Sequence, residues 1–147
     1  MRCAIMLAIG VKIADADWVA AYPKLAKLEK KFVEAGGLLL DGTDPTGYGG
    51  VVPGHAGKRE IELLMHDGGF SVEQAISIST LNGAKYLGRD KEVGTLEVGK
   101  RADIVVIDGD PVKDVAALEE MPLVFKNGVG YDTAKIFAAM KETVGLH

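Results

Sequence analysis

The stretch from Gly36 to Gly50 constrains the fold most strongly, because it joins an apolar run to a loop rich in glycine. Three successive leucines, residues 38–40, indicate a short strand that is buried on both faces. Asp44 follows in the loop, next to Thr43. In barrel enzymes the catalytic groups lie at the C-terminal ends of the strands. We therefore expect the carboxylate of Asp44 to be well placed for chemistry.

Length and charge exclude several classes of protein. A chain of 147 residues is long enough for one domain with a real core. The net charge is −4 and no basic stripe stands out, so we expect no nucleic-acid partner. The apolar run that begins at Cys3 is too short to span a membrane, so we expect no membrane partner. Cys3 is the single cysteine, which favours a reducing compartment, the cytoplasm.

Helices are predicted on both sides of the leucine run. Pro23 is typical of the first position of a helix, and Gly36-Gly37 is typical of a helix end. The apolar residues of this helix recur at helical spacing: Leu25, Leu28, Phe32 and Ala35. A second helix is predicted over residues 58–67. A third begins at the capping box Ser71-Val72-Glu73-Gln74 and runs to about Gly88.

The remainder of the chain is predicted to be mainly strands. Alternation predicts a short strand within 93–100 and a stronger strand over 102–108. One or two helical turns are expected within 114–120. Asn127-Gly128 lies between two apolar runs and predicts a β-hairpin. A helix is expected over 133–144.

Four separated stretches together carry a family signal: Gly42-Thr43-Asp44, residues 59–88, residues 93–106 and residues 124–128. In this order and spacing they resemble the C-terminal portion of the metal-dependent amidohydrolase superfamily, in its imidazolonepropionase-like and Xaa-Pro-dipeptidase-like branch. The resemblance implies an α/β fold, a (β/α)₈ barrel with a β-sandwich built from both ends of the polypeptide.

A complete barrel of this type needs about 250 residues. The resemblance therefore implies an incomplete barrel, in which this chain supplies the last strand–helix units and the C-terminal part of the composite β-sandwich. It divides the chain into residues 1–88 as the barrel fragment, 89–132 as the β-sandwich portion and 133–147 as a C-terminal helix.

The same resemblance gives Asp44 a catalytic and metal-binding role. The matching aspartate in the family binds a divalent metal, accepts a proton from the attacking water and passes it to the leaving nitrogen. It implies hydrolysis of a carbon–nitrogen bond in a small amide, lactam or dipeptide substrate, with zinc as the expected ion. From the residues alone, Asp44 is also explained as a cap of the turn before Pro45.

Substrate contacts are predicted around the same loop, at Thr43, Thr46, Gly47, Tyr48 and His55. Turn chemistry and a packed aromatic ring explain the four loop residues equally well. A lone histidine beside a loop is more often simply exposed.

The other metal ligands implied by the family are a His-x-His pair, a bridging lysine or glutamate, and two further histidines on earlier strands. This sequence has no His-x-His pattern, so the chain alone is expected to hold an incomplete metal site or no metal. The alternative to an enzyme is a catalytically incompetent fragment or a non-enzymatic module that self-associates or pairs with another chain. Exposed apolar faces and a free sheet edge would favour a homo-oligomer.

Overall fold

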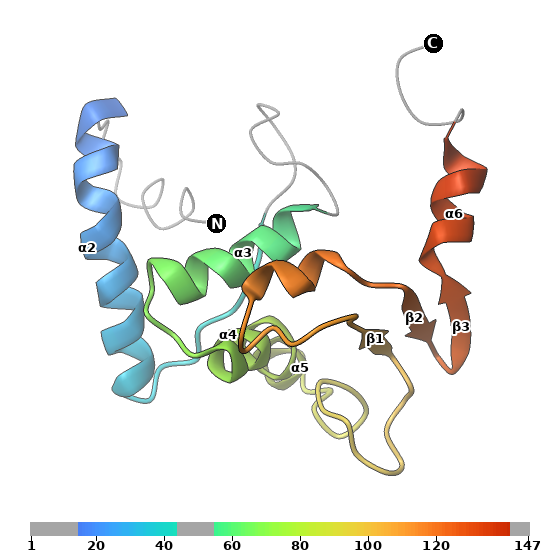
Figure 1. Ribbon diagram of the computed structural model, residues 1–147. Coiled ribbons are helices and arrows are strands. Elements are labelled where there is room, and N and C mark those ends of the chain that lie inside the picture. Colours follow the sequence, from blue (N-terminus) through green and yellow to red (C-terminus); the bar gives the residue numbers. More distant parts are fainter. Residues whose placement is uncertain (1–14, 44–54, 142–147) are drawn as a thin grey trace.

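A computed structural model of the chain describes residues 15–43 and 55–141; residues 1–14, 44–54 and 142–147 lie outside that description. The helices α2 to α5 come first in the chain, and a small antiparallel sheet follows with one further helix (Figure 1). Helix α2 lies at one end of the molecule and α6 at the other, with α3, α4 and the sheet between them (Figure 1).

Helix α2 spans Asp15–Glu34, and Pro23 lies inside it. The prediction that Pro23 begins the helix is therefore wrong. A proline in a helix interior removes one backbone hydrogen bond, and the alanines that precede Pro23 favour a continuous helix. The predicted apolar face is wrong in part, because Leu28 and Phe32 are at least half exposed while Ala26 is buried.

Residues 37–43 leave α2 as a segment without assigned secondary structure, which we call the extended segment. The strand predicted at residues 38–40 is therefore wrong. A strand requires a neighbouring strand to pair its backbone groups, and no strand of the described chain pairs with these residues. Burial on both faces is also wrong, because Leu38 is 43% exposed.

Three helices follow the extended segment: α3 (His55–His66), α4 (Val72–Ser79) and α5 (Leu81–Tyr86). The helix predicted over 58–67 is confirmed as α3. The capping box at the start of α4 is confirmed too, since the Gln74 amide donates to Ser71 Oγ at 3.3 Å and the Ser71 amide donates to Gln74 Oε1 at 3.1 Å.

The single helix predicted from Ser71 to Gly88 is broken at Thr80, which separates α4 from α5. Thr80 adopts a φ of −128° and a ψ of −74°, which are not helical values. Its hydroxyl donates to the carbonyl of Ile76 at 2.7 Å. A threonine hydroxyl that bonds back into the preceding turn competes with the regular ladder, which is a physical reason for the break.

The hydrophobic core lies between α3 and α4, around Leu64, Phe70, Ala75 and Ile78. Further apolar side chains pack against this cluster while remaining partly exposed: Val33, Leu39, Ile61 and Met65. Polar contacts hold α2 against this core. The hydroxyl of Tyr22 donates to Asp67 Oδ2 at 2.6 Å, and the ammonium of Lys30 lies 4.5 Å from the centre of the Phe70 ring.

The strand predicted within residues 93–100 is wrong, because the chain makes turns there. Gly94 and Gly99 have φ values of +97° and +91°. A strand excludes such values, and glycine adopts them readily. Gly94 also lies so close to α5 that an added Cβ would be 2.7 Å from the Cβ of Ala84. The turns therefore pack directly onto the helix.

The sheet has the order β1-β2-β3 and is antiparallel throughout. Its strands are β1 (Ile104–Val106), β2 (Leu123–Lys126) and β3 (Val129–Asp132). The predicted hairpin is confirmed, and its turn residues Asn127 and Gly128 have φ values of +52° and +80°. The strand predicted over 102–108 is shorter than expected, because Ala102 and Asp103 bind the hairpin turn instead.

The two remaining predicted helical pieces are present, although the last helix ends at Met140 and residues 142–144 of that prediction lie outside the described residues. A 3₁₀ helix, η1 (Val115–Glu119), begins at Asp114, whose carboxylate accepts from the Ala116 amide at 3.0 Å. Helix α6 (Thr133–Met140) begins at Asp132, which accepts from the Lys135 amide at 3.1 Å. No side chain of α6 is buried. The division of the chain at residues 88 and 132 stays a prediction.

Candidate active site

The extended segment is the structural base of the candidate site, because it leads directly into the loop that contains Asp44. Leu39 packs against the core cluster below it. The side-chain amide of Asn82, near the start of α5, donates to the carbonyl of Leu39 at 2.8 Å. Helices α3, α4 and α5 therefore determine where the backbone enters the loop.

Asp41 follows Leu39 by two positions in the extended segment and is half-buried. Its Oδ1 atom is buried and has no hydrogen-bond partner, and the same is true of the Ser79 hydroxyl. Burial raises the pKa of Asp41 above its ordinary value, and nearby Ser79 opposes that rise only in part. Ser79 is therefore a polar neighbour of Asp41 and does not satisfy its buried Oδ1 atom.

Two of the predicted site residues lie among the described residues, and four lie outside them. Thr43 is half-buried at the end of the extended segment, and His55 begins α3. Four predicted site residues lie outside the described residues: Asp44, Thr46, Gly47 and Tyr48. The assigned roles of all six residues stay predictions.

His55 is engaged by a neighbouring acidic group. Its Nδ1 atom lies 3.6 Å from Glu119 Oε1, and more than half of its side chain is exposed. Lys58, one turn further along α3, forms an ion pair with the other oxygen of Glu119. Lys58 is the main reason that the pKa of Glu119 is lowered. This group of charges links α3 to η1, on the side of α3 where the loop returns to the described chain.

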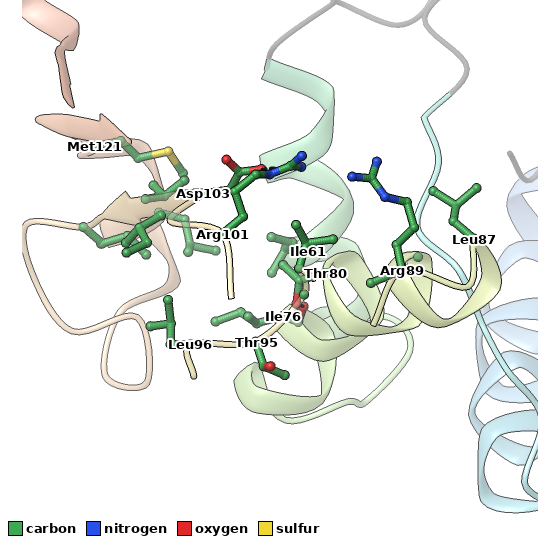
Figure 2. A pocket seen from close by; sticks show the side chains of 18 residues that line it. Ile61, Ile76, Thr80, Leu87, Arg89, Thr95, Leu96, Arg101, Asp103 and Met121 are labelled. Atoms are coloured by element: carbon green, nitrogen blue, oxygen red, sulfur yellow. Dashed lines mark hydrogen bonds and ion pairs between the residues drawn. The ribbon is translucent and has the colours of Figure 1, made fainter. Parts of the chain in front are cut away.

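The cavity in Figure 2, with a volume of about 680 Å³, lies between the α3–α5 helices and the turns that lead to β1. Apolar side chains such as Ile61, Ile76 and Leu96 line it. Arginines also line it, but the structure pairs Arg89 with Glu92 and Arg101 with Asp103. None of the predicted site residues lines this cavity. Its lining is therefore mainly apolar, and the carboxylate of Asp103 in it is engaged by Arg101.

Within the part of the chain that the structure describes, no three histidine, cysteine, aspartate or glutamate side chains are grouped so that they could hold a metal ion. No helix among the described residues is long and apolar enough to span a membrane.

The sequence analysis assigned no role to Asp41 or Asn82. Asp41 belongs to the extended segment, and Asn82 donates a hydrogen bond to it. Asn82 carries a usable signal, because it is a polar residue that follows a helix-breaking threonine by two positions. Asp41 carries a signal too, since it directly follows three leucines. A carboxylate at such a position is either paired or shifted in pKa.

A comparison with protein-family models matches residues 21–139 to the amidohydrolase family. The chain belongs to the amidohydrolase family. Among curated amidohydrolase relatives, a 5-methylthioadenosine/S-adenosylhomocysteine deaminase of Moorella thermoacetica is 37% identical over 106 residues, which is 70% of this chain and 19% of the deaminase. An imidazolonepropionase of Bacteroides fragilis is 52% identical over 40 residues, which is 27% of this chain and 10% of that enzyme.

Solved amidohydrolase-type structures resemble the fold as well. A proposed prolidase from Bifidobacterium longum matches 77% of this chain and 29% of its own length, with a TM-score of 0.60 and 38% identity. A Xaa-Pro dipeptidase with methionine bound in its active site matches 75% of this chain and 26% of its own, with a TM-score of 0.60 and 30% identity. These relatives imply a barrel-type α/β fold, of which the described helices and small sheet form a part.

Proposed function

We propose that this chain is the C-terminal part of a metal-dependent amidohydrolase that hydrolyses a carbon–nitrogen bond in a small amide, lactam or dipeptide substrate. The observation that carries the proposal is the family match over residues 21–139, which includes the loop with Asp44 and the elements on both sides of it. The chain spans 19% of the matched deaminase and 29% of the matched prolidase-type structure, so the remaining strands of such an enzyme are not in the described chain.

The extended segment supports a role for Asp44 because it anchors the chain just before the loop. Leu39 packs on the core, and Asp41 is half-buried near Ser79. Asp44 follows these anchored residues by a few positions in the sequence.

Asp44 would hold the divalent metal, for which we propose zinc. When bound, such an ion polarises the substrate carbonyl and lowers the pKa of water to about 7. The Asp44 carboxylate would accept the proton of the attacking water and then deliver it to the leaving nitrogen, because an amide nitrogen is a poor leaving group until it is protonated. Thr43, Thr46, Gly47 and Tyr48 would contact the substrate from the same loop, and His55 from its far end.

This chain would supply one ligand of such a metal site, Asp44. Asp44 is a suitable oxygen donor for a divalent ion. His55 is the histidine that follows the loop, and its imidazole lies beside Glu119 at 3.6 Å. The other ligands would come from other strands of the barrel. The proposed division into residues 1–88, 89–132 and 133–147, and the proposed cytoplasmic location, accompany this assignment.

Metal analysis combined with a hydrolysis screen tests the proposal. The 147-residue chain would be dialysed against a low concentration of zinc, analysed for bound metal and assayed with amides, lactams and X-Pro dipeptides. If the wild-type chain binds zinc, Asp44→Asn should remove that zinc together with any turnover, and Asp90→Asn, which changes a carboxylate outside the loop, should leave both unchanged. Zinc bound by the wild-type chain and retained in Asp44→Asn would contradict the assignment of Asp44, and absence of zinc and turnover in the wild-type chain favours the alternative of a catalytically incompetent fragment.

A second candidate function is self-association of a non-enzymatic module. Large apolar side chains on two separate helices are exposed, and these are Leu28 and Phe32 on α2 and Ile136 and Phe137 on α6. In the described sheet, β1 and β3 are both edge strands. Exposed apolar side chains and free edges favour association. We therefore retain a homo-oligomer as part of the proposal, and the second function is favoured if the chain binds no metal.

A further inference from the structure

One face of helix α2 exposes apolar side chains to solvent. Leu28 is 61% exposed and Phe32 is 50% exposed. Residues four positions apart are neighbours on the surface of a helix, so these two side chains lie side by side. Ala26 is buried, and it is two positions, or about half a turn, away from Leu28. Leu28 and Phe32 therefore lie on the side of α2 that faces away from the core.

The same face of α2 is basic. Lys24, Lys27 and Lys31 are exposed, and each lies within four positions of Leu28. Among the described residues, no ion pair or side-chain hydrogen bond engages any of these three lysines. We call the surface formed by the three lysines, Leu28 and Phe32 the α2 face.

Helix α6 lies at the opposite end of the molecule from α2 (Figure 1), and a groove lies beside it. The groove has a volume of about 770 Å³ and is lined by parts of α3, η1, β2 and α6. Its apolar lining includes Pro122, Val124 and Phe137. The Phe137 side chain is 75% exposed. This groove, which we call the α6 groove, can therefore accept apolar side chains from a partner.

The α6 groove is also acidic. The carboxylates of Asp108, Glu119 and Glu120 line it. Lys58 pairs with Glu119, whereas the carboxylates of Asp108 and Glu120 have no ion-pair partner in the part of the chain that the structure describes. These two negative charges are therefore left without a neighbouring cation, and a basic partner would complement them.

The α2 face and the α6 groove are complementary in charge, and both contain exposed apolar side chains. An amphipathic helix binds a hydrophobic groove through apolar anchors about one turn apart, which is the spacing of Leu28 and Phe32. We propose that the α2 face of one copy of this chain docks into the α6 groove of a second copy. The lysines of the α2 face then lie opposite Asp108 and Glu120. This inference rests on the proposed self-association and is independent of the metal.

Charge reversal on each surface separately tests the contact. Lys24→Glu with Lys27→Glu reverses the α2 face, and Asp108→Lys with Glu120→Lys reverses the α6 groove. Each double variant should raise the dissociation constant of self-association about tenfold or more, because like charges then meet. An equimolar mixture of the two variants should associate again, since each reversed surface meets one of opposite charge. Sedimentation velocity of the full 147-residue chain at low salt measures all three samples.

Lys85→Glu with Lys91→Glu is the matched control, because it makes the same change in net charge away from both surfaces. This variant should associate like the wild-type chain. The substituted side chains of all three variants are exposed, and circular dichroism checks that each variant is folded. If the groove variant does not fold, the α2 variant and its control still decide the matter. Raising the salt concentration should also weaken wild-type association several-fold, since salt screens exposed charges.

The same measurements separate this inference from the proposed self-association. A wild-type chain that stays monomeric at every concentration would overturn both. A wild-type chain that associates, together with reversed variants that associate equally well, would overturn only the contact between the α2 face and the α6 groove. Loss of association in each variant without recovery in their mixture would also overturn this contact, because the two surfaces would then not meet each other.

Discussion

At the scale of single residues, Asp41 is the clearest case of a charge in an unfavourable position. Its Oδ1 atom is buried without a hydrogen-bond partner, and burial raises its pKa. The folded state therefore binds a proton at Asp41 more tightly than the unfolded state does. Stability from this group is complete below the unfolded pKa of about 4 and is lost as the pH rises through the folded pKa.

We predict that Asp41→Asn raises the melting temperature at pH 7 by on the order of a few degrees, because it removes a charge that is costly when buried. At about pH 3 the difference between variant and wild type should vanish, since Asp41 is then protonated. Thermal melts of both proteins at the two pH values check this. A variant that is less stable at pH 7 would contradict this, because it would mean that the ionised carboxylate of Asp41 makes a stabilising interaction in the folded state.

At the scale of elements, the hairpin is held by Asp103. Its Oδ1 accepts from the Asn127 amide at 2.7 Å and its Oδ2 accepts from Lys126 Nζ at 2.7 Å. These two hydrogen bonds lower the pKa of Asp103 to about 2, and the bond from Lys126 has the larger effect. The carboxylate therefore stabilises the hairpin above about pH 4, and this contribution is lost as the pH falls toward 2.

A nuclear magnetic resonance titration of the Asn127 amide follows this group directly. We predict a midpoint near pH 2 in the wild-type chain and no such transition in Asp103→Ala. Asp110→Ala, which removes a carboxylate from a different turn, should leave the transition in place. A midpoint near 4 would show that Lys126 and the Asn127 amide do not engage the carboxylate in solution.

The capping box of α4 gives a second prediction at this scale. Ser71→Ala removes the acceptor for the Gln74 amide and should destabilise the chain by about 1 kcal/mol. Ser77→Ala changes a serine within the same helix and should have little effect, because alanine has the higher helix propensity. Urea denaturation of the two variants measures both values. Equal stability of the two would mean that the cap contributes nothing.

Local chemistry made some elements predictable from the sequence. The capping box at Ser71 and the Asn127-Gly128 turn specify their structures within four residues, and both predictions are confirmed. Contacts that the apolar pattern does not show decided the others. Residues 38–40 have the composition of a strand, yet no described strand pairs with them. Thr80 breaks a helix whose apolar pattern continues across it, because its hydroxyl bonds backward to Ile76.

The candidate site stays a prediction at its centre. The motif around Asp44 predicts a metal ligand in that loop, and Asp44 lies outside the described residues. The contact between Asn82 and Leu39 was not predictable, since it joins residues 43 positions apart and depends on the helix break at Thr80. Periodicity within one element carries no information about such a contact.

At the scale of the whole molecule, large apolar side chains on α6 are exposed to solvent. No side chain of α6 is buried, and Phe137 is 75% exposed. We predict that the chain associates at micromolar concentration, and that Phe137→Lys together with Ile136→Lys shifts it toward the monomer. Sedimentation velocity over a tenfold range of concentration measures this. A compact wild-type monomer throughout would contradict the prediction.

The central claim is that Asp44 provides a ligand for a divalent metal. Paramagnetic line broadening by Mn²⁺ tests this claim most directly, because the method detects even weak binding to a single carboxylate. The resonances of Gly42 and Thr43 would be followed in the wild-type chain and in Asp44→Asn, with the exposed Asp110 as an internal reference. The account predicts broadening at Gly42 and Thr43 at lower Mn²⁺ concentration than at Asp110, and loss of that broadening in Asp44→Asn. Broadening that is the same in both proteins, or weaker than at Asp110 in the wild type, would contradict it.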